Sequence, residues 1–66
     1  MVIINDRDKI QWIKDMTVSD VLQSMGYEFT MITVAVNGEL VSEEDYDSFP
    51  VPDNADINIF HLAHGG

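Results

Sequence analysis

The chain has 66 residues, which allows one domain with a modest core and leaves little room for a deep catalytic cleft. The absence of cysteine excludes disulfides, thiolate metal sites and a cysteine nucleophile, and the lack of a membrane-length apolar run or a signal-peptide pattern predicts a cytoplasmic protein that does not contact a membrane. The formal net charge is -9, from 12 acidic and 3 basic residues. This charge disfavours nucleic acid, and it indicates either attraction to a basic face on a protein partner or no more than solubility, two interpretations of equal weight.

The first predicted elements are two short strands. Residues 2–5 are β-prone and end in a polar cluster at residues 5–8, which is typical of a turn. Residues 9–13 then show a rough alternation, with Ile10 and Trp12 on one face. Together the two runs predict a β-hairpin.

An amphipathic helix is predicted after this hairpin. Thr17 and Asp20 form a capping-box pattern in which aspartate replaces the usual glutamate. Apolar residues then recur at helical spacing, at Val18, Val21, Leu22 and Met25. Gly26 predicts the end of the helix, because glycine tolerates the left-handed conformation of a C-cap.

A second hairpin is predicted beyond the helix. Residues 32–36 are rich in β-branched side chains, which favour a strand. Asn37 and Gly38 follow directly, and this pair is a strong signal for a two-residue hairpin turn. Residues 39–41 are therefore expected to return as the partner strand.

The remaining chain is predicted to contain one more strand. Residues 42–45 are expected to form a short helical turn, and residues 49–54 a proline-containing loop. Residues 55–60 are predicted to form the last strand, with Ile57 and Ile59 on one face and Asp56 and Asn58 on the other. We therefore divide the chain into a β-grasp domain at residues 1–60 and a flexible C-terminal tail at residues 61–66.

The order of these elements predicts an α+β fold. A hairpin, one crossing helix and further strands of the same sheet form the β-grasp, or ubiquitin-like, layout, with roughly four or five strands in a mixed sheet and the helix packed on one face. The predicted core consists of apolar residues from these elements: Ile4, Val18, Val21, Leu22, Met25, Val34, Val36, Ile57 and Ile59.

The final pair, Gly65 and Gly66, is the first feature that suggests chemistry. Two residues without a Cβ atom make a thin, pliable segment that can enter a narrow channel of another protein, where the Gly66 carboxylate would be open to activation. The alternative is an incidental chain end, since termini are commonly disordered. The β-grasp pattern that precedes the pair favours a functional role.

Segments along the whole chain resemble the ThiS family of sulfur carriers, within the wider ThiS/MoaD ubiquitin-like superfamily. The matching segments are Thr17 and Val18, Val21 and Leu22, residues 34–41, residues 56–60, and Gly65 with Gly66. No single motif is decisive, but the ordered set, together with the chain length, is specific.

The resemblance implies a carrier protein and not an enzyme. In such a system a ThiF-like adenylating enzyme uses ATP and Mg to activate the terminal glycine, here Gly66, and a sulfur donor protein displaces AMP to leave a thiocarboxylate. A ThiG-like thiazole synthase then takes the sulfur for thiamine biosynthesis. The resemblance also implies that Gly65 and Gly66 form the reacting site, that this chain holds no cofactor or metal of its own, and that it is a monomer when free.

Two histidines and an acidic run resemble possible metal sites. His64 departs from the small or apolar residue that relatives commonly carry before the glycines, which bears on the identity of the partner. His61 and His64 are too few for a zinc site, which needs three or four ligands, so we expect two solvated tail histidines that contact a partner. Residues 43–47 lack the ligand spacing of a calcium loop and are expected to form a solvated turn.

Other functions stay open from the sequence. The small subunit of molybdopterin synthase delivers sulfur from the same kind of tail, although such relatives tend to be longer, and carriers for cysteine synthesis or tRNA thiolation also fit. A ubiquitin-like modifier would be joined to lysines of other proteins through Gly66. A plain β-grasp interaction module would tolerate the loss of Gly66.

Overall fold

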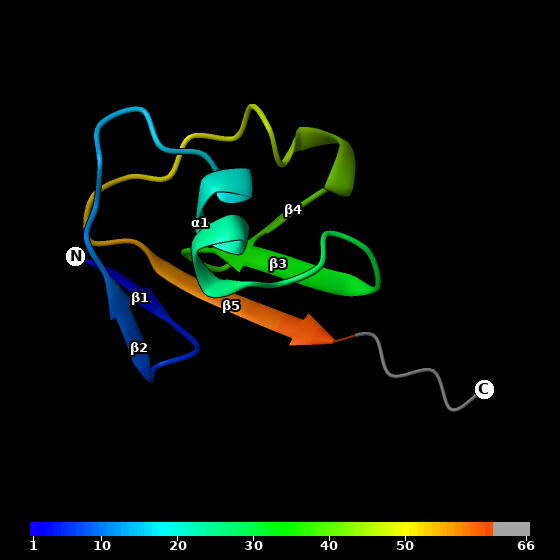
Figure 1. Ribbon diagram of the computed structural model, residues 1–66, viewed down its shortest axis with the longest axis horizontal. Helices are drawn as coiled ribbons and strands as arrows, with labels where there is room; N and C mark the ends of the chain where they lie inside the picture. The colour runs from blue at the N-terminus through cyan, green and yellow to red at the C-terminus, as the bar shows by residue number, and fades with distance from the viewer. Residues whose placement is uncertain (62–66) are drawn as a thin grey trace.

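The computed structural model describes residues 1–61, which form one sheet with a helix across one of its faces (Figure 1). The elements in chain order are β1 (Val2–Ile4), β2 (Asp8–Ile10), α1 (Val18–Met25), β3 (Ile32–Val36), β4 (Glu39–Val41), the 3-10 helix η1 (Glu43–Asp45) and β5 (Asp56–His61). The five strands lie in the order β2-β1-β5-β3-β4. Strands β1 and β5 are parallel and the other neighbours are antiparallel. The predicted α+β fold with a mixed sheet and one packed helix is confirmed.

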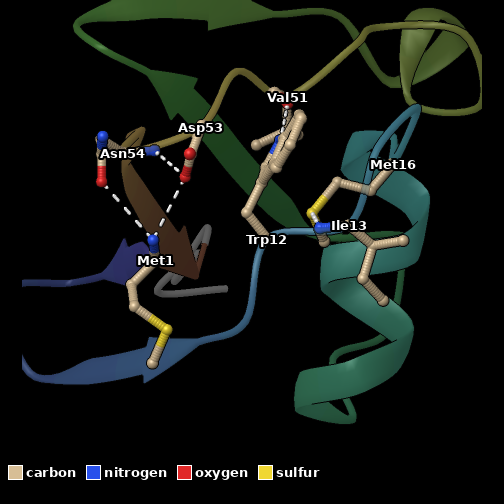
Figure 2. A network of polar contacts seen from close by, with 7 residues as sticks. All are labelled: Met1, Trp12, Ile13, Met16, Val51, Asp53 and Asn54. Atoms are coloured by element: carbon tan, nitrogen blue, oxygen red, sulfur yellow. Dashed lines mark hydrogen bonds and ion pairs between the residues drawn. The ribbon is translucent and has the colours of Figure 1, made fainter.

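Strand β2 is shorter than the sequence pattern predicts. It ends at Ile10, so the predicted strand at residues 9–13 is wrong over its second part. The indole Nε1 of Trp12 donates a 2.7 Å hydrogen bond to the carbonyl oxygen of Val51, in the loop that precedes β5 (Figure 2). This contact ties the chain to that loop immediately after β2, and it joins residues too far apart in sequence for local alternation to indicate.

The β3–β4 hairpin turns at the predicted Asn37-Gly38 pair. Val36 pairs with Glu39 across the turn, and φ is 51° at Asn37 and 84° at Gly38. Two consecutive positive φ values produce the turn whose twist matches that of the flanking strands, and asparagine and glycine adopt them at low cost. Local sequence alone is sufficient to specify this hairpin.

Both predicted ends of α1 are confirmed. The Thr17 side chain accepts a hydrogen bond from the backbone N–H of Asp20, and the Asp20 carboxylate accepts one of 2.9 Å from the N–H of Thr17. At the other end Gly26 has a φ of 76°, and its N–H donates to the carbonyl oxygens of Gln23 and Leu22. An N-cap side chain such as that of Thr17 typically stabilises a helix by about 1 kcal/mol.

The loop between η1 and β5 covers the N-terminus of α1. The backbone N–H of Val18 donates to the carbonyl oxygen of Phe49 at 3.1 Å, and the N–H of Ser19 donates to that of Tyr46 at 2.9 Å. The Ser19 hydroxyl also donates to the carboxylate of Asp47. The loop therefore satisfies first-turn N–H groups that have no partner within the helix.

Tyr46 shows that residues 43–47 are more than a solvated turn. Its side chain is 2% exposed and belongs to the hydrophobic core. The ring meets that of Phe29 edge-on, with 6.3 Å between centroids, while Glu43 and Glu44 remain exposed. The interpretation as a solvated turn is correct for those glutamates and wrong for the tyrosine, which anchors the segment to the core.

The core lies between α1 and the sheet. Every predicted core residue is buried except Met25, which is half-buried against the same cluster. The cluster also contains residues that the sequence analysis did not assign to it: Val2, Met16, Ile32, Val41, Tyr46, Val51 and Ala55. Three of these, Tyr46, Val51 and Ala55, come from the segment between η1 and β5, where no periodic pattern indicates burial.

Strand β5 occupies the centre of the sheet and is held on both sides. It pairs along its length with β3, from Val36 opposite Ile57 to Ile32 opposite His61, whereas β1 pairs only with its beginning. Asn5 extends the contact with β1. Its N–H donates to the carbonyl oxygen of Ile57 at 2.8 Å, and its side-chain Oδ1 accepts a 2.7 Å hydrogen bond from the N–H of Ile59.

Replacing Asn5 tests this attachment. Asn5 has a φ of 54°, so Asn5→Ala removes the acceptor for Ile59 and also strains the backbone, and we expect a loss of about 2 kcal/mol in the free energy of unfolding. Asn5→Gly removes the acceptor without the strain and should cost about 1 kcal/mol. Urea unfolding measures both losses. Amide hydrogen exchange at Ile59 should accelerate in both variants, and unchanged exchange would contradict the role assigned to the side chain.

Tyr46 predicts a loss of stability at alkaline pH. Burial, followed by the negative charge of Glu43, raises the pKa of the Tyr46 hydroxyl above its usual value of 10.0. The unfolded chain therefore releases this proton at a lower pH than the folded protein, so the contribution to stability is present below about pH 10 and is lost as pH rises through the folded pKa.

Urea unfolding followed by Trp12 fluorescence measures this effect. We expect the free energy of unfolding to fall more steeply above about pH 10 in the wild type than in Tyr46→Phe, which has no hydroxyl to titrate. Below that pH the two proteins should share the same pH dependence. Identical curves above it would show that Tyr46 does not carry the effect.

Candidate functional site

The candidate reacting residues, Gly65 and Gly66, lie outside the described residues, as does His64. The structure describes the support from which that segment departs, because β5 ends at His61. His61 was expected in the tail, and the structure instead places it opposite Ile32 in the β3–β5 ladder. The candidate site is therefore built from the end of β5 and the two surfaces on either side of it.

The first surface is the sheet face opposite α1, here called the outer face. Ile32, Val34 and Val36 of β3 belong to the core, so the alternation of a strand places Thr33 and Ala35 on the outer face. Their cross-strand partners lie there too.

Two large apolar side chains stand on this outer face. Phe60 is paired with Thr33 and Leu40 with Ala35, and they are 56% and 71% exposed. Ala35 lies between their strands and is buried without belonging to the core cluster. A single exposed apolar residue is ordinary, but two on one face beside the strand that leads to the C-terminal segment mark a candidate docking surface.

The second surface lies on the helix side of the sheet, where the chain passes from α1 to β3. The rings of Tyr27 and His61 approach to 5.6 Å between centroids. They line a cavity of about 440 Å³ together with Met25 and Met31. Met31 is 53% exposed and has a φ of 61°, a conformation that is uncommon for a bulky side chain. Apolar groups therefore flank the end of β5 on both faces.

The charges of the chain are separated along its sequence. Arg7, Lys9 and Lys14 are its three basic residues. Two of the 12 acidic residues, Asp6 and Asp8, precede Lys14, so residues 15–66 contain 10 carboxylates and no lysine or arginine. The cavity beside the end of β5 accordingly has one carboxylate, that of Glu28, and no lysine or arginine in its lining, a charge balance that suits a basic surface.

The described part of the chain has neither a metal-binding cluster nor a membrane-spanning helix. Residues 1–61 contain no group of three or more histidine, cysteine, aspartate or glutamate side chains placed to hold a metal ion. No helix in the same range is long and apolar enough to cross a membrane.

Sequence reasoning did not single out Phe60 or Leu40 as candidate docking residues. The alternation that placed Ile57 and Ile59 in the core also implies that Phe60 faces the opposite side, so the signal was present for that residue. Leu40 becomes recognisable only with the β3–β4 register, which places it beside Ala35. The pairing of Tyr27 with His61 had no signal in the sequence.

Comparison with known proteins connects this architecture to a family. The sequence model of the ThiS family matches residues 2–66, and no curated protein sequence matches the chain.

Two solved structures share the fold, both of proteins from Geobacter metallireducens. A crystal structure of thiamine biosynthesis protein (ThiS) is 21% identical, covers 98% of this chain and 97% of its own, and superposes with a TM-score of 0.79. A solution NMR structure of a thiamine biosynthesis protein is also 21% identical, covers 98% of this chain and 86% of its own, and has a TM-score of 0.75. At this identity the two structures establish a shared fold. Because the family model spans nearly the whole sequence, including Gly65 and Gly66, this chain belongs to the ThiS family.

Proposed function

We propose that this protein is a sulfur carrier in thiamine biosynthesis, which delivers sulfur for the thiazole ring from its C-terminal glycine. The observation that carries the proposal is the ThiS-family match over residues 2–66, which takes in the Gly65-Gly66 pair. In this proposal the folded body docks and the glycine segment reacts. The chain is a co-substrate of its partners and not an enzyme.

The proposed chemistry occurs at the carboxyl group of Gly66. The carboxylate attacks the α-phosphorus of ATP in a ThiF-like adenylating enzyme, pyrophosphate leaves, and an acyl-adenylate forms. Sulfur at the sulfide level from a donor protein then attacks the carbonyl carbon, AMP leaves, and a thiocarboxylate remains. A ThiG-like thiazole synthase consumes that sulfur. ATP and Mg belong to the adenylating partner, and this chain supplies no cofactor.

The described surfaces suit such a role. Strand β5 is held by hydrogen bonds to β1, β3 and Asn5. A partner that binds the folded domain therefore also fixes the position from which the following segment begins. Phe60 and Leu40 offer apolar contact on the outer face. The carboxylates of residues 15–66 favour association with a basic surface. In this proposal the partner therefore binds close to the end of β5, where the reacting segment begins.

Removal of Gly66 tests the reacting group. We expect the shortened chain to unfold at the same urea concentration as the wild type, because the core cluster is formed by residues from Val2 to Ile59. We also expect it to accept no AMP from a ThiF-like enzyme supplied with ATP. Intact-mass analysis after addition of a sulfur donor should detect the replacement of one oxygen by sulfur at Gly66 of the wild type. Ser42→Ala, an exposed change before η1 that removes no charge and no capping hydrogen bond, serves as the control that keeps full reaction.

Three results would overturn the proposal. One is sulfur delivery by the shortened chain, because its new terminal carboxyl group, on Gly65, lies one residue short of the position that the mechanism requires. Another is the recovery of wild-type protein joined to lysines, which identifies a modifier. The third is a thiocarboxylated chain that supplies molybdopterin synthesis and not thiazole synthesis.

The outer face yields a separate prediction. Phe60→Ala should lower kcat/KM for adenylation by about tenfold, because an apolar side chain at the centre of an interface typically contributes more than 1 kcal/mol to binding. Ile13→Ala is the matched control, since Ile13 is similarly exposed, at 63%, but lies in the loop after β2. Adenylation should also weaken as salt is raised, because exposed charges are screened. Equal rates for the two variants would remove Phe60 from the docking surface.

A further inference from the structure

Strand β2 is an edge of the sheet, and its backbone offers hydrogen-bonding groups on that side. Lys9 pairs with Ile3, and the N–H of Ile3 donates to the carbonyl oxygen of Ala55 on the β5 side. Backbone groups of an antiparallel pair point either toward each other or away from each other. The N–H and C=O of Lys9 therefore point outward, where none of strands β1 to β5 pairs with them.

A groove of about 700 Å³ lies beside this edge, between β2 and α1. Ile10, Ile13 and Met16 provide its apolar lining, and Lys14, Gln23 and Ser24 provide polar groups. Ile10 packs against the core cluster, so the helix-side face of β2 opens into the groove. The groove therefore adjoins a strand edge that can accept another strand.

The wall of the groove is held in place by hydrogen bonds (Figure 2). The N–H of Ile13 donates to the Met16 sulfur at 3.3 Å, and the N–H of Met16 donates back to the carbonyl oxygen of Ile13 at 3.0 Å. The N–H of Val51 donates to the carbonyl oxygen of Met16 at 2.9 Å, and Trp12 donates to the carbonyl oxygen of Val51. Ile13 is thus held 63% exposed in a fixed turn. A partner would not have to order this turn on binding.

The positive charges of the chain gather at the same edge. Lys9 lies on the outer face, opposite in direction to Ile10, and Arg7 and Lys14 flank the strand in sequence. Carboxylates are present as well. Asp8 lies 3.6 Å from Arg7, Asp20 is engaged in capping α1, and Asp15 lines the groove. Residues 6–15 thus carry three basic groups and three carboxylates, Asp6 being the third, whereas the other 56 residues carry nine carboxylates and no lysine or arginine. The β2 edge is therefore the least negative part of a chain of net charge -9.

We propose that the β2 edge and its groove bind an extended segment of a protein partner in which apolar side chains alternate with acidic ones. The segment adds to the sheet as a sixth strand by pairing with the backbone of Lys9. One set of its side chains enters the groove beside Ile10 and Ile13, and the other set lies on the outer face beside Lys9 and Arg7. This alternation follows from the period of a strand, whose successive side chains point to opposite faces.

This binding is independent of the proposed carrier function. Figure 1 shows β2 at one side of the molecule and the C-terminal end of β5 well away from it. A partner on β2 therefore leaves the outer-face residues Phe60 and Leu40 uncovered. The two activities can fail separately, because the first is measured by peptide binding and the second by adenylation.

The test uses two short capped peptides, one in which valine alternates with aspartate and one in which valine alternates with lysine. Amide signals of the isotope-labelled full chain are followed by NMR during titration. We expect the aspartate peptide to shift signals in residues 8–14 and 20–24 with a dissociation constant below about 1 mM, and the lysine peptide to bind there at least about tenfold more weakly. The overall charge of -9 favours the opposite order. A tighter lysine peptide, or an aspartate peptide that leaves β2 unshifted, overturns the proposal.

Two variants locate the binding to the strand edge. Lys9→Pro removes the outward N–H, which an edge strand tolerates when that group faces solvent, and should reduce binding of the aspartate peptide at least about tenfold. Lys9→Gln keeps the N–H and should lose less. Ile13→Asp changes an exposed side chain in the groove and should also abolish binding, which keeps the test valid if the proline variant fails to fold. Unchanged binding by folded Lys9→Pro and Ile13→Asp overturns the proposal, while adenylation by Ile13→Asp stays at the wild-type rate.

Discussion

The two-sided pairing of β5 is the constraint on which the rest of this structure depends. The strand joins the N-terminal hairpin, through β1, to the β3–β4 hairpin, and neither hairpin pairs with the other. An isolated two-stranded hairpin is only marginally stable in water. The central strand β5 therefore stabilises both hairpins by joining them into one sheet. Asn5 strengthens this join by extending the contact past the end of β1 to Ile59. The segment that follows His61 therefore departs from the central strand of the sheet, at an end that pairs with Ile32 of β3.

A second set of contacts, made by a loop, compensates for the small size of the chain. The loop between η1 and β5 supplies Tyr46, Val51 and Ala55 to the core and also satisfies the first-turn N–H groups of α1. Full burial of a large apolar side chain contributes about 1.5–3 kcal/mol, which is a substantial fraction of the stability of a domain this size. A segment without helix or strand periodicity thus contributes both packing and capping. It also holds Trp12, and through Trp12 the turn beside β2.

The same small body presents two surfaces of different chemical character. The end of β5 has apolar residues on both faces and lies in the part of the chain that has carboxylates and no lysine or arginine. The β2 edge has outward backbone groups, an adjoining groove and the basic residues of the chain. A domain with little room for a catalytic cleft can contribute to a reaction by docking to proteins that have one. The separation of charge gives each surface a preferred class of partner.

The sequence by itself determined the local elements of this protein. The capping box at Thr17 and Asp20, the glycine stop at Gly26 and the Asn37-Gly38 turn act within a few residues, and the helical and strand periods placed nearly all of the predicted core correctly. Only the tertiary structure decided the early end of β2, the burial of Tyr46, and the meeting of His61 with Tyr27. Each of these depends on contacts between residues distant in sequence, which no local period or turn signal encodes. The candidate site divides in the same way, because Gly65 and Gly66 can be recognised from the sequence alone, whereas the docking surface at Leu40 exists only once strand register brings distant residues onto one face.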